Sequence, residues 1–274
     1  MENNFKNVLE VRNLTVRVQT KKGQKTLVDS GNFVVKEGEC LGILGESGSG
    51  KSMTVKSILG LLDQQFQVEG EAWFFGKDLL SQSKEEVRKL RGKKIAMVLQ
   101  NPMTCFDPLC KISMQIGETF QTHMDWDKQT IYEKSIELLK DMQIRDPEEV
   151  MEKYPHQLSG GMLQRIMIGI ALSMEPELLV ADEPTTAIDA ITQYDILKEF
   201  RRIKKEKKTA MIFITHDLGA ISYVADRIIV MNQGKIVDEG SFSHILKEAN
   251  DPYTQMLAEK KCAVMEKYRK MLGK

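Results

Sequence analysis

Apolar and polar positions recur with two different periods along the chain, and these periods predict strands and helices in turn. The segment "LEVRNLTVRV" (Leu9 to Val18) alternates and is rich in β-branched residues, which predicts a half-buried strand, and "TKKGQKT" after it is typical of a polar turn. "ECLGILG" predicts a buried strand, and the run from Lys51 to Leu62 predicts a helix. The chain therefore opens with β structure and continues as strand, glycine-rich loop and helix.

Later segments predict a helical insert followed by a return to strands and helices. "KKIAMVLQ" (Lys93 to Gln100) reads as a short strand before the breaker-rich "NPMTCFDPL". From Ile112 to about Tyr154, apolar residues recur at three- and four-residue spacing, as in helices. Alternation returns in "ELLVADE", "ITQYDILKEFRRIKKEKK", "TAMIFITHD" and "RIIVMNQGKIVDEG", where "NQG" predicts a hairpin turn. Strands that alternate with helices predict a mostly parallel sheet.

Composition narrows the class of protein without naming an activity. The chain has 274 residues, 42% hydrophobic and 28% charged, as in ordinary soluble globular proteins. Lys+Arg and Asp+Glu both number 39, so net charge gives no reason to expect a nucleic-acid partner. We find no signal-peptide pattern, and no segment approaches the roughly 20 apolar residues of a membrane helix. The four scattered cysteines suit a reducing compartment. We expect a cytosolic or peripheral protein.

A phosphate-binding loop follows the second predicted strand. "GESGSGKS" matches G-x-x-x-x-G-K-[ST] at every position and has a strand before it and a helix after it. Its backbone N–H groups are expected to wrap the phosphates of a nucleotide, Lys51 to reach the β- and γ-phosphates, and the Ser52 hydroxyl to ligate Mg²⁺. The expected nucleotide-binding residues are Gly45, Glu46, Ser47, Gly48, Ser49, Gly50, Lys51 and Ser52.

Three further strand ends carry residues suited to phosphate chemistry. "LLVADE" ends in Asp182, expected to hold Mg²⁺ directly or through water, and in Glu183, a general base whose role is worth ~10²–10⁴-fold in rate. A parallel sheet would bring His216 of "FITHD" to the same edge as Gly45 and Asp182. Gln100, also at a strand end, is a candidate to ligate Mg²⁺ or orient water. These residues favour a P-loop NTPase and leave kinases, GTPases and motors open.

A second segment, "LSGGMLQR" (Leu158 to Arg165), also looks like a phosphate-binding helix start. With it, the chain resembles the ATP-binding-cassette (ABC) ATPases, whose phosphate loop, Gln100, "LSGGM", "LLVADE", "AID" and His216 occur here in the family's order. The resemblance implies an α/β fold: a P-loop NTPase (RecA-like) core with an N-terminal antiparallel β region and an inserted α-helical subdomain. A single nucleotide-binding domain would span residues 1–274, with the ATP-binding core at 1–100 and 160–245, a helical signature subdomain at 101–159 and a C-terminal helical tail at 246–274.

The resemblance also implies that two such domains pair head to tail around ATP and Mg²⁺. Each ATP would lie between one chain's phosphate loop and the other chain's signature, and Asp189 of "AID" would lie at the dimer seam. A helix N-terminus suits the partner's γ-phosphate because its N–H groups and partial positive charge attract anions. The residues expected to face the partner's ATP are Leu158, Ser159, Gly160, Gly161 and Gln164.

As a transporter subunit of this kind, the chain would act at the cytoplasmic face of the membrane. The helical insert would grip a short helix of a permease, and the expected partners are a second, similar but distinct ATPase, two permease subunits and an extracytoplasmic solute-binding protein. One residue departs from the family pattern: Val18 stands where many members stack an aromatic ring on adenine, and an aliphatic contact is expected to supply less energy.

The motifs further resemble the nickel and peptide import branch of the family. "GGMLQRIMIGIAL" and "TQYDIL" are closer to nickel and metal-chelate importers, whereas peptide importers usually carry "GGMRQR". The chain also ends soon after "DPYTQMLAEKKC", before the cysteine-bearing extension of many peptide-import ATPases. We expect ATP-driven uptake of nickel or a metal chelate. Oligopeptide or dipeptide import, and a soluble P-loop ATPase that is not coupled to transport, remain the alternatives.

Overall fold

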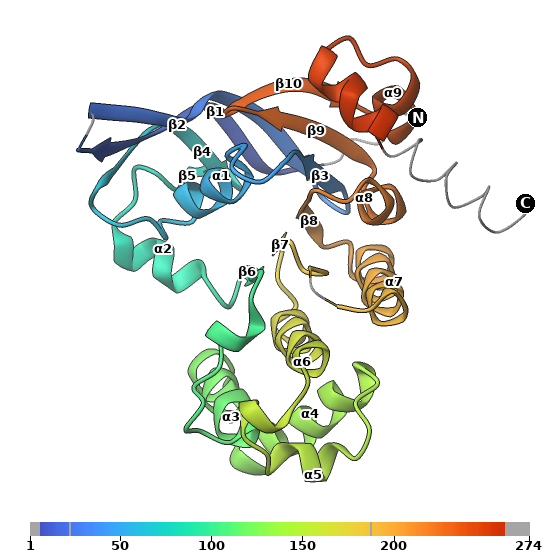
Figure 1. The fold of residues 1–274 in the computed structure, drawn as a ribbon. Coiled ribbons are helices and arrows are strands. Elements are labelled where there is room, and N and C mark those ends of the chain that lie inside the picture. The colour runs from blue at the N-terminus through green and yellow to red at the C-terminus, as the bar shows by residue number, and fades with distance from the viewer. Residues whose placement is uncertain (1–5, 22, 187, 261–274) are drawn as a thin grey trace, which may run out of the picture. The chain divides into compact units, whose positions relative to one another are not determined.

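The computed structural model describes residues 6–21, 23–186 and 188–260, which divide into two compact units. Of the described residues, 6–87 and 210–260 belong to unit 1, and those from 88 to 209 to unit 2 (Figure 1). The first and last parts of the sequence thus fold together, because their strands pair with each other.

Unit 1 contains an antiparallel sheet with the strand order β2-β1-β4-β5. Its strands are β1 (Asn7–Thr20), β2 (Gly23–Lys36), β4 (Phe66–Phe74) and β5 (Lys77–Asp78). The predicted strand over Leu9 to Val18 is confirmed, but the turn after it is shorter than predicted, since pairing continues as far as Thr20 and Gly23. Backbone pairing satisfies N–H and C=O groups whatever the side chains, so a polar stretch can extend a hairpin.

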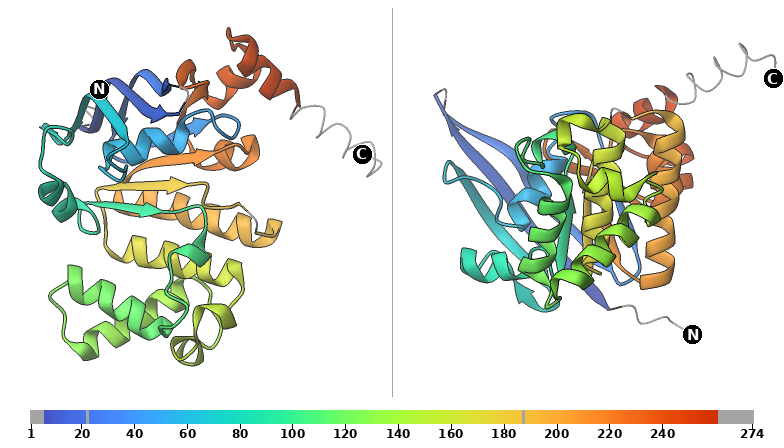
Figure 2. Two further views of the ribbon diagram at one scale, coloured as in Figure 1. Left: turned by 60° about the vertical axis from the view of Figure 1, so that its left-hand side comes forward. Right: turned by 90° about the horizontal axis from the view of Figure 1, so that it is seen from below.

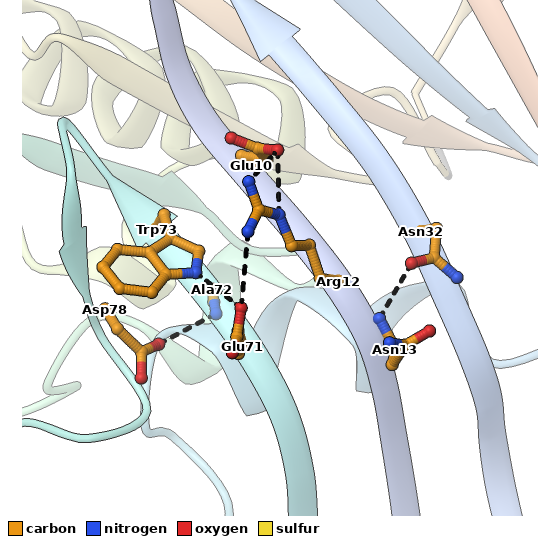
Figure 3. A network of polar contacts seen from close by, with 8 residues as sticks. All are labelled: Glu10, Arg12, Asn13, Asn32, Glu71, Ala72, Trp73 and Asp78. Carbon is orange, nitrogen blue, oxygen red and sulfur yellow. Dashed lines mark hydrogen bonds and ion pairs between the residues drawn. The ribbon is translucent and has the colours of Figure 1, made fainter.

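The middle of β1 is irregular, and polar side chains bridge the strands around this point (Figure 3). Asn13 has a φ of 51°, and the register of β1 against β4 shifts there. Arg12 lies between two carboxylates: its Nη2 is 2.7 Å from Oε1 of Glu10, and its Nη1 is 3.8 Å from Oε2 of Glu71 on β4. The second of these exposed contacts joins β1 to β4 beside the bulge.

The second sheet of unit 1 has the order β10-β9-β3-β8. Its strands are β3 (Cys40–Leu44), β8 (Ala210–Thr215), β9 (Arg227–Asn232) and β10 (Lys235–Gly240). β3 is parallel to both β8 and β9, which confirms the predicted parallel pairing, and β9 and β10 form the predicted hairpin. Gln233 and Gly234 in its turn have φ angles of 47° and 84°, as a two-residue hairpin turn requires.

The helices of unit 1 are α1 (Lys51–Ile58), α8 (Leu218–Val224) and α9 (Phe242–Lys247), α2 (Lys84–Leu90) begins in it, and residues 252–260 are also helical. α1 ends before the predicted Leu62. Gly60 has a φ of 62°, its N–H donates to the Ser57 carbonyl, and the Leu61 N–H donates to the Lys56 carbonyl. This Schellman arrangement closes a helix at a glycine. The rest of the predicted C-terminal tail, 261–274, lies outside the described residues.

Unit 2 joins two parallel strands to a group of helices (Figure 2). The strands are β6 (Ile95–Val98) and β7 (Leu178–Asp182), and the helices are α3 (Ile112–His123), α4 (Lys128–Asp141), α5 (Pro147–Met151), α6 (Gly160–Ser173) and α7 (Ala190–Lys207), with short 3₁₀ turns at Pro102–Thr104 and Pro155–Gln157. Buried Phe120, Leu139, Leu163 and Phe200 bring these helices together. In the part of the chain that the structure describes, no helix is long and apolar enough to span a membrane.

Candidate functional site

The loop Gly45–Ser52 connects the end of β3 to α1 in unit 1. Lys51 is only 4% exposed, and its Nζ donates to the carbonyl oxygens of Gly45 and Glu46, both at 2.9 Å. α1 begins after Gly50, which has a φ of 106° and provides no side-chain cap. The first N–H groups of a helix have no acceptor within the helix itself, and a phosphate oxygen is a suitable acceptor for such groups.

The surroundings of this loop fit a polyphosphate ligand. A Cβ on Gly45 or Gly50 would lie 2.4 and 2.7 Å, respectively, from a backbone carbonyl oxygen, so a side chain at either position would displace the loop. The Ser49 carbonyl accepts a hydrogen bond from the Gly234 N–H at 2.9 Å, which ties the loop to the β9–β10 turn. The Ser49 hydroxyl is buried and has no hydrogen-bond partner among the described residues. An ammonium, N–H donors and a hydroxyl together suit a phosphate chain.

A contact that sequence reasoning missed holds the first half of the loop. The Glu46 backbone N–H donates to the Tyr253 hydroxyl at 2.8 Å, and Nζ of Lys260 lies 3.1 Å from Oε1 of Glu46. Glu46 and Tyr253 are 207 residues apart in the sequence. In the sequence, "DPYT" predicts the start of a helix, but it does not predict that Tyr253 in this segment contacts the phosphate loop.

His216 follows β8 directly, as Gly45 follows β3. β3 and β8 are parallel and pair Leu44 with Thr215, so the next residue of each strand lies at the same carboxyl edge. His216 is exposed there. The Asp217 N–H donates to the Thr215 hydroxyl at 3.0 Å, and the Asp217 side chain caps α8, so both neighbours of His216 are fixed.

The other strand-end residues meet one another in unit 2. Asp182 ends β7 and is 2% exposed. Glu183 follows it with a φ of 46°, a left-handed conformation that costs a residue with a side chain about 1–2 kcal/mol. Nε2 of Gln100 donates to Oε2 of Glu183 at 3.2 Å, and the Thr186 hydroxyl donates to the same oxygen at 2.9 Å. Strain of this kind gathers at functional sites, where it aims a side chain.

The signature segment forms the start of α6. Ser159 is the N-cap, and its hydroxyl accepts a hydrogen bond from the Met162 N–H at 3.2 Å. Among the described residues, a Cβ on Gly160 would meet nothing within 4 Å, and one on Gly161 would make an ordinary contact at 3.6 Å. Packing among these residues therefore does not require a glycine at either position, whereas close approach of another molecule would. Leu158, just before them, is buried.

Gln164 and Asp189 have partners within the chain. Gln164 is 1% exposed, and its Nε2 donates to the Pro184 carbonyl at 2.7 Å, which ties α6 to the turn that carries Glu183. Oδ1 of Asp189 accepts hydrogen bonds from two N–H groups in the first turn of α7, and this lowers the pKa of the Asp189 carboxyl, with the Thr192 N–H as the largest cause.

Residues 28–186 match the family model described as "ABC transporter". The chain is 43% identical over 265 residues to "Metal-staphylopine import system ATP-binding protein CntD" of Staphylococcus aureus, and the match covers 97% of each chain. It is 42% identical over 247 residues to "Oligopeptide transport ATP-binding protein OppD" of Haemophilus influenzae, which covers 90% of this chain and 76% of the relative.

A solved structure shares the fold. It is the dimeric post-hydrolysis state of the ATP-binding cassette MJ0796 bound to ADP and Pi. It superposes on this chain with a TM-score of 0.78 at 26% identity, and the match covers 85% of this chain and 98% of that one. This likeness confirms the predicted α/β P-loop NTPase fold.

Proposed function

The chain belongs to the ABC transporter family and is an ATP-hydrolysing subunit of an ABC importer, and from this premise we propose that it energises the uptake of a metal chelate or of nickel. The observation that carries the substrate class is the 43% identity to the metal-staphylopine import subunit over 265 residues. The sequence "GGMLQRIMIGIAL" supports the same class.

Hydrolysis would use the phosphate loop together with the strand-end residues predicted from the sequence. ATP binds at the phosphate loop, where Lys51 and the N–H groups at the start of α1 hold its β- and γ-phosphates. Glu183, oriented by Gln100 and Thr186, would accept the proton of the attacking water. His216 follows β8 at the same sheet edge as Gly45 and would contact the γ-phosphate of this ATP.

Ser52, Gln100 and Asp182 offer a hydroxyl, an amide oxygen and a carboxylate, which are the oxygen ligands that Mg²⁺ prefers. Mg²⁺ held by them would neutralise charge that develops on the phosphates.

The signature would complete the site of a second cassette. The N–H groups at the start of α6 suit a γ-phosphate, and the open space beside Gly160 allows it to approach the backbone. Ile191, 77% exposed just after Asp189, adds an apolar surface suited to the dimer seam. ATP would then draw two cassettes together, and hydrolysis would release them. We expect the second cassette to be a distinct subunit.

The surface that leads into α3 supports a permease partner. Met103, Leu109 and Met114 are 50%, 83% and 61% exposed, and they lie within a short stretch after Gln100. Exposed apolar side chains of this size in one segment are typical of an interaction surface. Two permease subunits, an extracytoplasmic binding protein and a peripheral position on the cytoplasmic face of the membrane complete the proposal.

Peptide import is the second candidate, favoured by the 42% identity to the oligopeptide transport subunit. The test is uptake of labelled nickel, with and without a small chelator, against uptake of a labelled peptide in cells that carry wild type or Glu183→Gln. Loss of metal uptake alone supports metal import, and loss of peptide uptake alone supports the second candidate. If neither uptake depends on Glu183 while the purified chain hydrolyses ATP, a soluble ATPase is favoured and import of these substrates is refuted.

A further inference from the structure

The C-terminal helical segment, residues 252–260, reaches the phosphate loop through two side chains. The Tyr253 hydroxyl accepts a hydrogen bond from the Glu46 backbone N–H at 2.8 Å, and Lys260 pairs with the Glu46 side chain at 3.1 Å. All these residues lie in unit 1. The first contact is to the backbone of the loop itself, so it does not depend on the identity of the side chain at position 46.

The Tyr253 ring has a fixed position from which to make this contact. Its own N–H and that of Thr254 donate to Oδ1 of Asp251 at 2.9 and 3.2 Å, which fixes the start of the helical segment. The ring packs against the cluster of buried residues that contains Leu44 and Ile245. Burial is the largest cause of the shift in the pKa of Tyr253 and raises that pKa, so the hydroxyl stays neutral near pH 7.

The peptide bond between Gly45 and Glu46 is held from both of its ends. Its carbonyl oxygen, from Gly45, accepts a hydrogen bond from Nζ of Lys51 at 2.9 Å, and its N–H, from Glu46, donates to Tyr253. Glycine places the weakest steric limits on backbone rotation, so outside contacts help to fix the peptide after Gly45. The two hydrogen bonds together fix the direction in which the loop leaves β3.

We propose that Tyr253 is a positioning residue for the phosphate loop, which holds the Gly45–Glu46 peptide in the orientation that nucleotide binding needs. Lys260 adds a weaker ionic contact, since both side chains of that pair are more than half exposed. The proposal rests on the assignment of ATP to this loop. When only a fraction of the free protein has the competent loop, the apparent Kd rises in inverse proportion to that fraction.

The test is Tyr253→Phe in the full chain, which removes one oxygen and keeps the ring. A lost neutral hydrogen bond of this kind weakens binding about three- to tenfold, so the Kd for both ATP and ADP should rise by that factor. In the assembled transporter, KM for ATP should rise by a similar factor with kcat nearly unchanged, because the contact favours ground state and transition state alike. Lys260→Gln should change Kd less than about twofold.

A second measurement reads the loop directly. In Tyr253→Phe, hydrogen exchange of the Glu46 amide should become faster, while amides of α4 exchange as in wild type. Tyr132→Phe is the matched control, because it removes the hydroxyl of an exposed tyrosine of α4 in unit 2. It should leave Kd, KM and exchange in the loop unchanged.

The outcomes separate this inference from the proposed function. If wild type binds ATP and Tyr253→Phe binds it equally well with unchanged exchange at Glu46, the positioning role is wrong. If Tyr253→Phe lowers only the thermal midpoint and leaves KM unaltered, Tyr253 is structural and the role is again wrong. If wild type itself binds no nucleotide, the assignment of ATP to the loop fails instead.

Discussion

Replacing Gly160 with alanine should stabilise the isolated chain and impair the assembled ATPase. Gly160 is the first residue of α6, and a Cβ there would meet nothing within 4 Å among the residues that the structure describes. Glycine in the middle of a helix costs about 0.5–1 kcal/mol relative to alanine, and the gain at this first position is at most of that size. For a chain of this size, such a gain would raise Tm by up to about 3 °C.

The effect on activity should have the opposite sign. The added methyl group would separate the partner's γ-phosphate from the N–H groups that begin α6. Loss of one hydrogen bond to a charged group costs about 1.5–3 kcal/mol, so ATPase activity should fall about ten- to a hundredfold. The assays are thermal unfolding of the purified chain and phosphate release by the assembled transporter.

Gly169→Ala in the same helix is the matched control. A Cβ there would lie 2.8 Å from side-chain atoms of Leu138 and Met142, so the variant should lose about 1–3 kcal/mol of stability through overpacking. The proposed approach of a γ-phosphate to Gly160 is refuted if Gly160→Ala keeps full ATPase activity, or if it lowers Tm as Gly169→Ala does. The first outcome would mean that no ligand approaches the start of α6, and the second that Gly160 serves the fold.

Four other changes test separate contacts. Glu183→Gln should lower ATPase activity by ~10²–10⁴-fold and trap an ATP-bound dimer that elutes early in size-exclusion chromatography, and equal activity in the two proteins would contradict the general-base role. Lys51→Ala should weaken ATP binding at least about tenfold in a titration, because it removes a charged phosphate contact, and unchanged affinity would contradict its role. Gln164→Leu leaves the Pro184 carbonyl without its donor and should cost about 1–3 kcal/mol in urea unfolding, whereas an unchanged midpoint would show that the contact is dispensable. Asp127→Ala removes the side chain that caps α4. The Thr130 N–H is the largest cause that lowers the pKa of the Asp127 carboxyl, and a lowered pKa stabilises the fold above the unfolded-state pKa, so the Tm difference from wild type should be full at pH 7 and shrink as pH falls through the folded-state pKa. Asp127→Asn can still cap the helix, so its Tm at pH 7 should fall less.

The sequence by itself determined the features that depend on residues close together in the sequence, namely the phosphate loop, individual strands and the hairpin turn. The phosphate loop could be located because its glycines, Lys51 and Ser52 lie within eight consecutive residues between a strand and a helix. Periodicity placed β1 and β7, and the "NQG" hairpin was confirmed, because side-chain alternation and turn chemistry are local properties. The misplaced end of α1 was a boundary error, since Gly60 already marked it.

Only the tertiary structure decided which distant residues meet. Gln100 and Glu183 were both predicted at strand ends, but their hydrogen bond follows from the parallel pairing of β6 with β7. The burial of Gln164 against the Pro184 carbonyl and the contact of Tyr253 with Glu46 have no counterpart in the local pattern. A hydrogen bond between residues 207 apart depends on how strands and helices pack, and local periodicity carries no information about that packing.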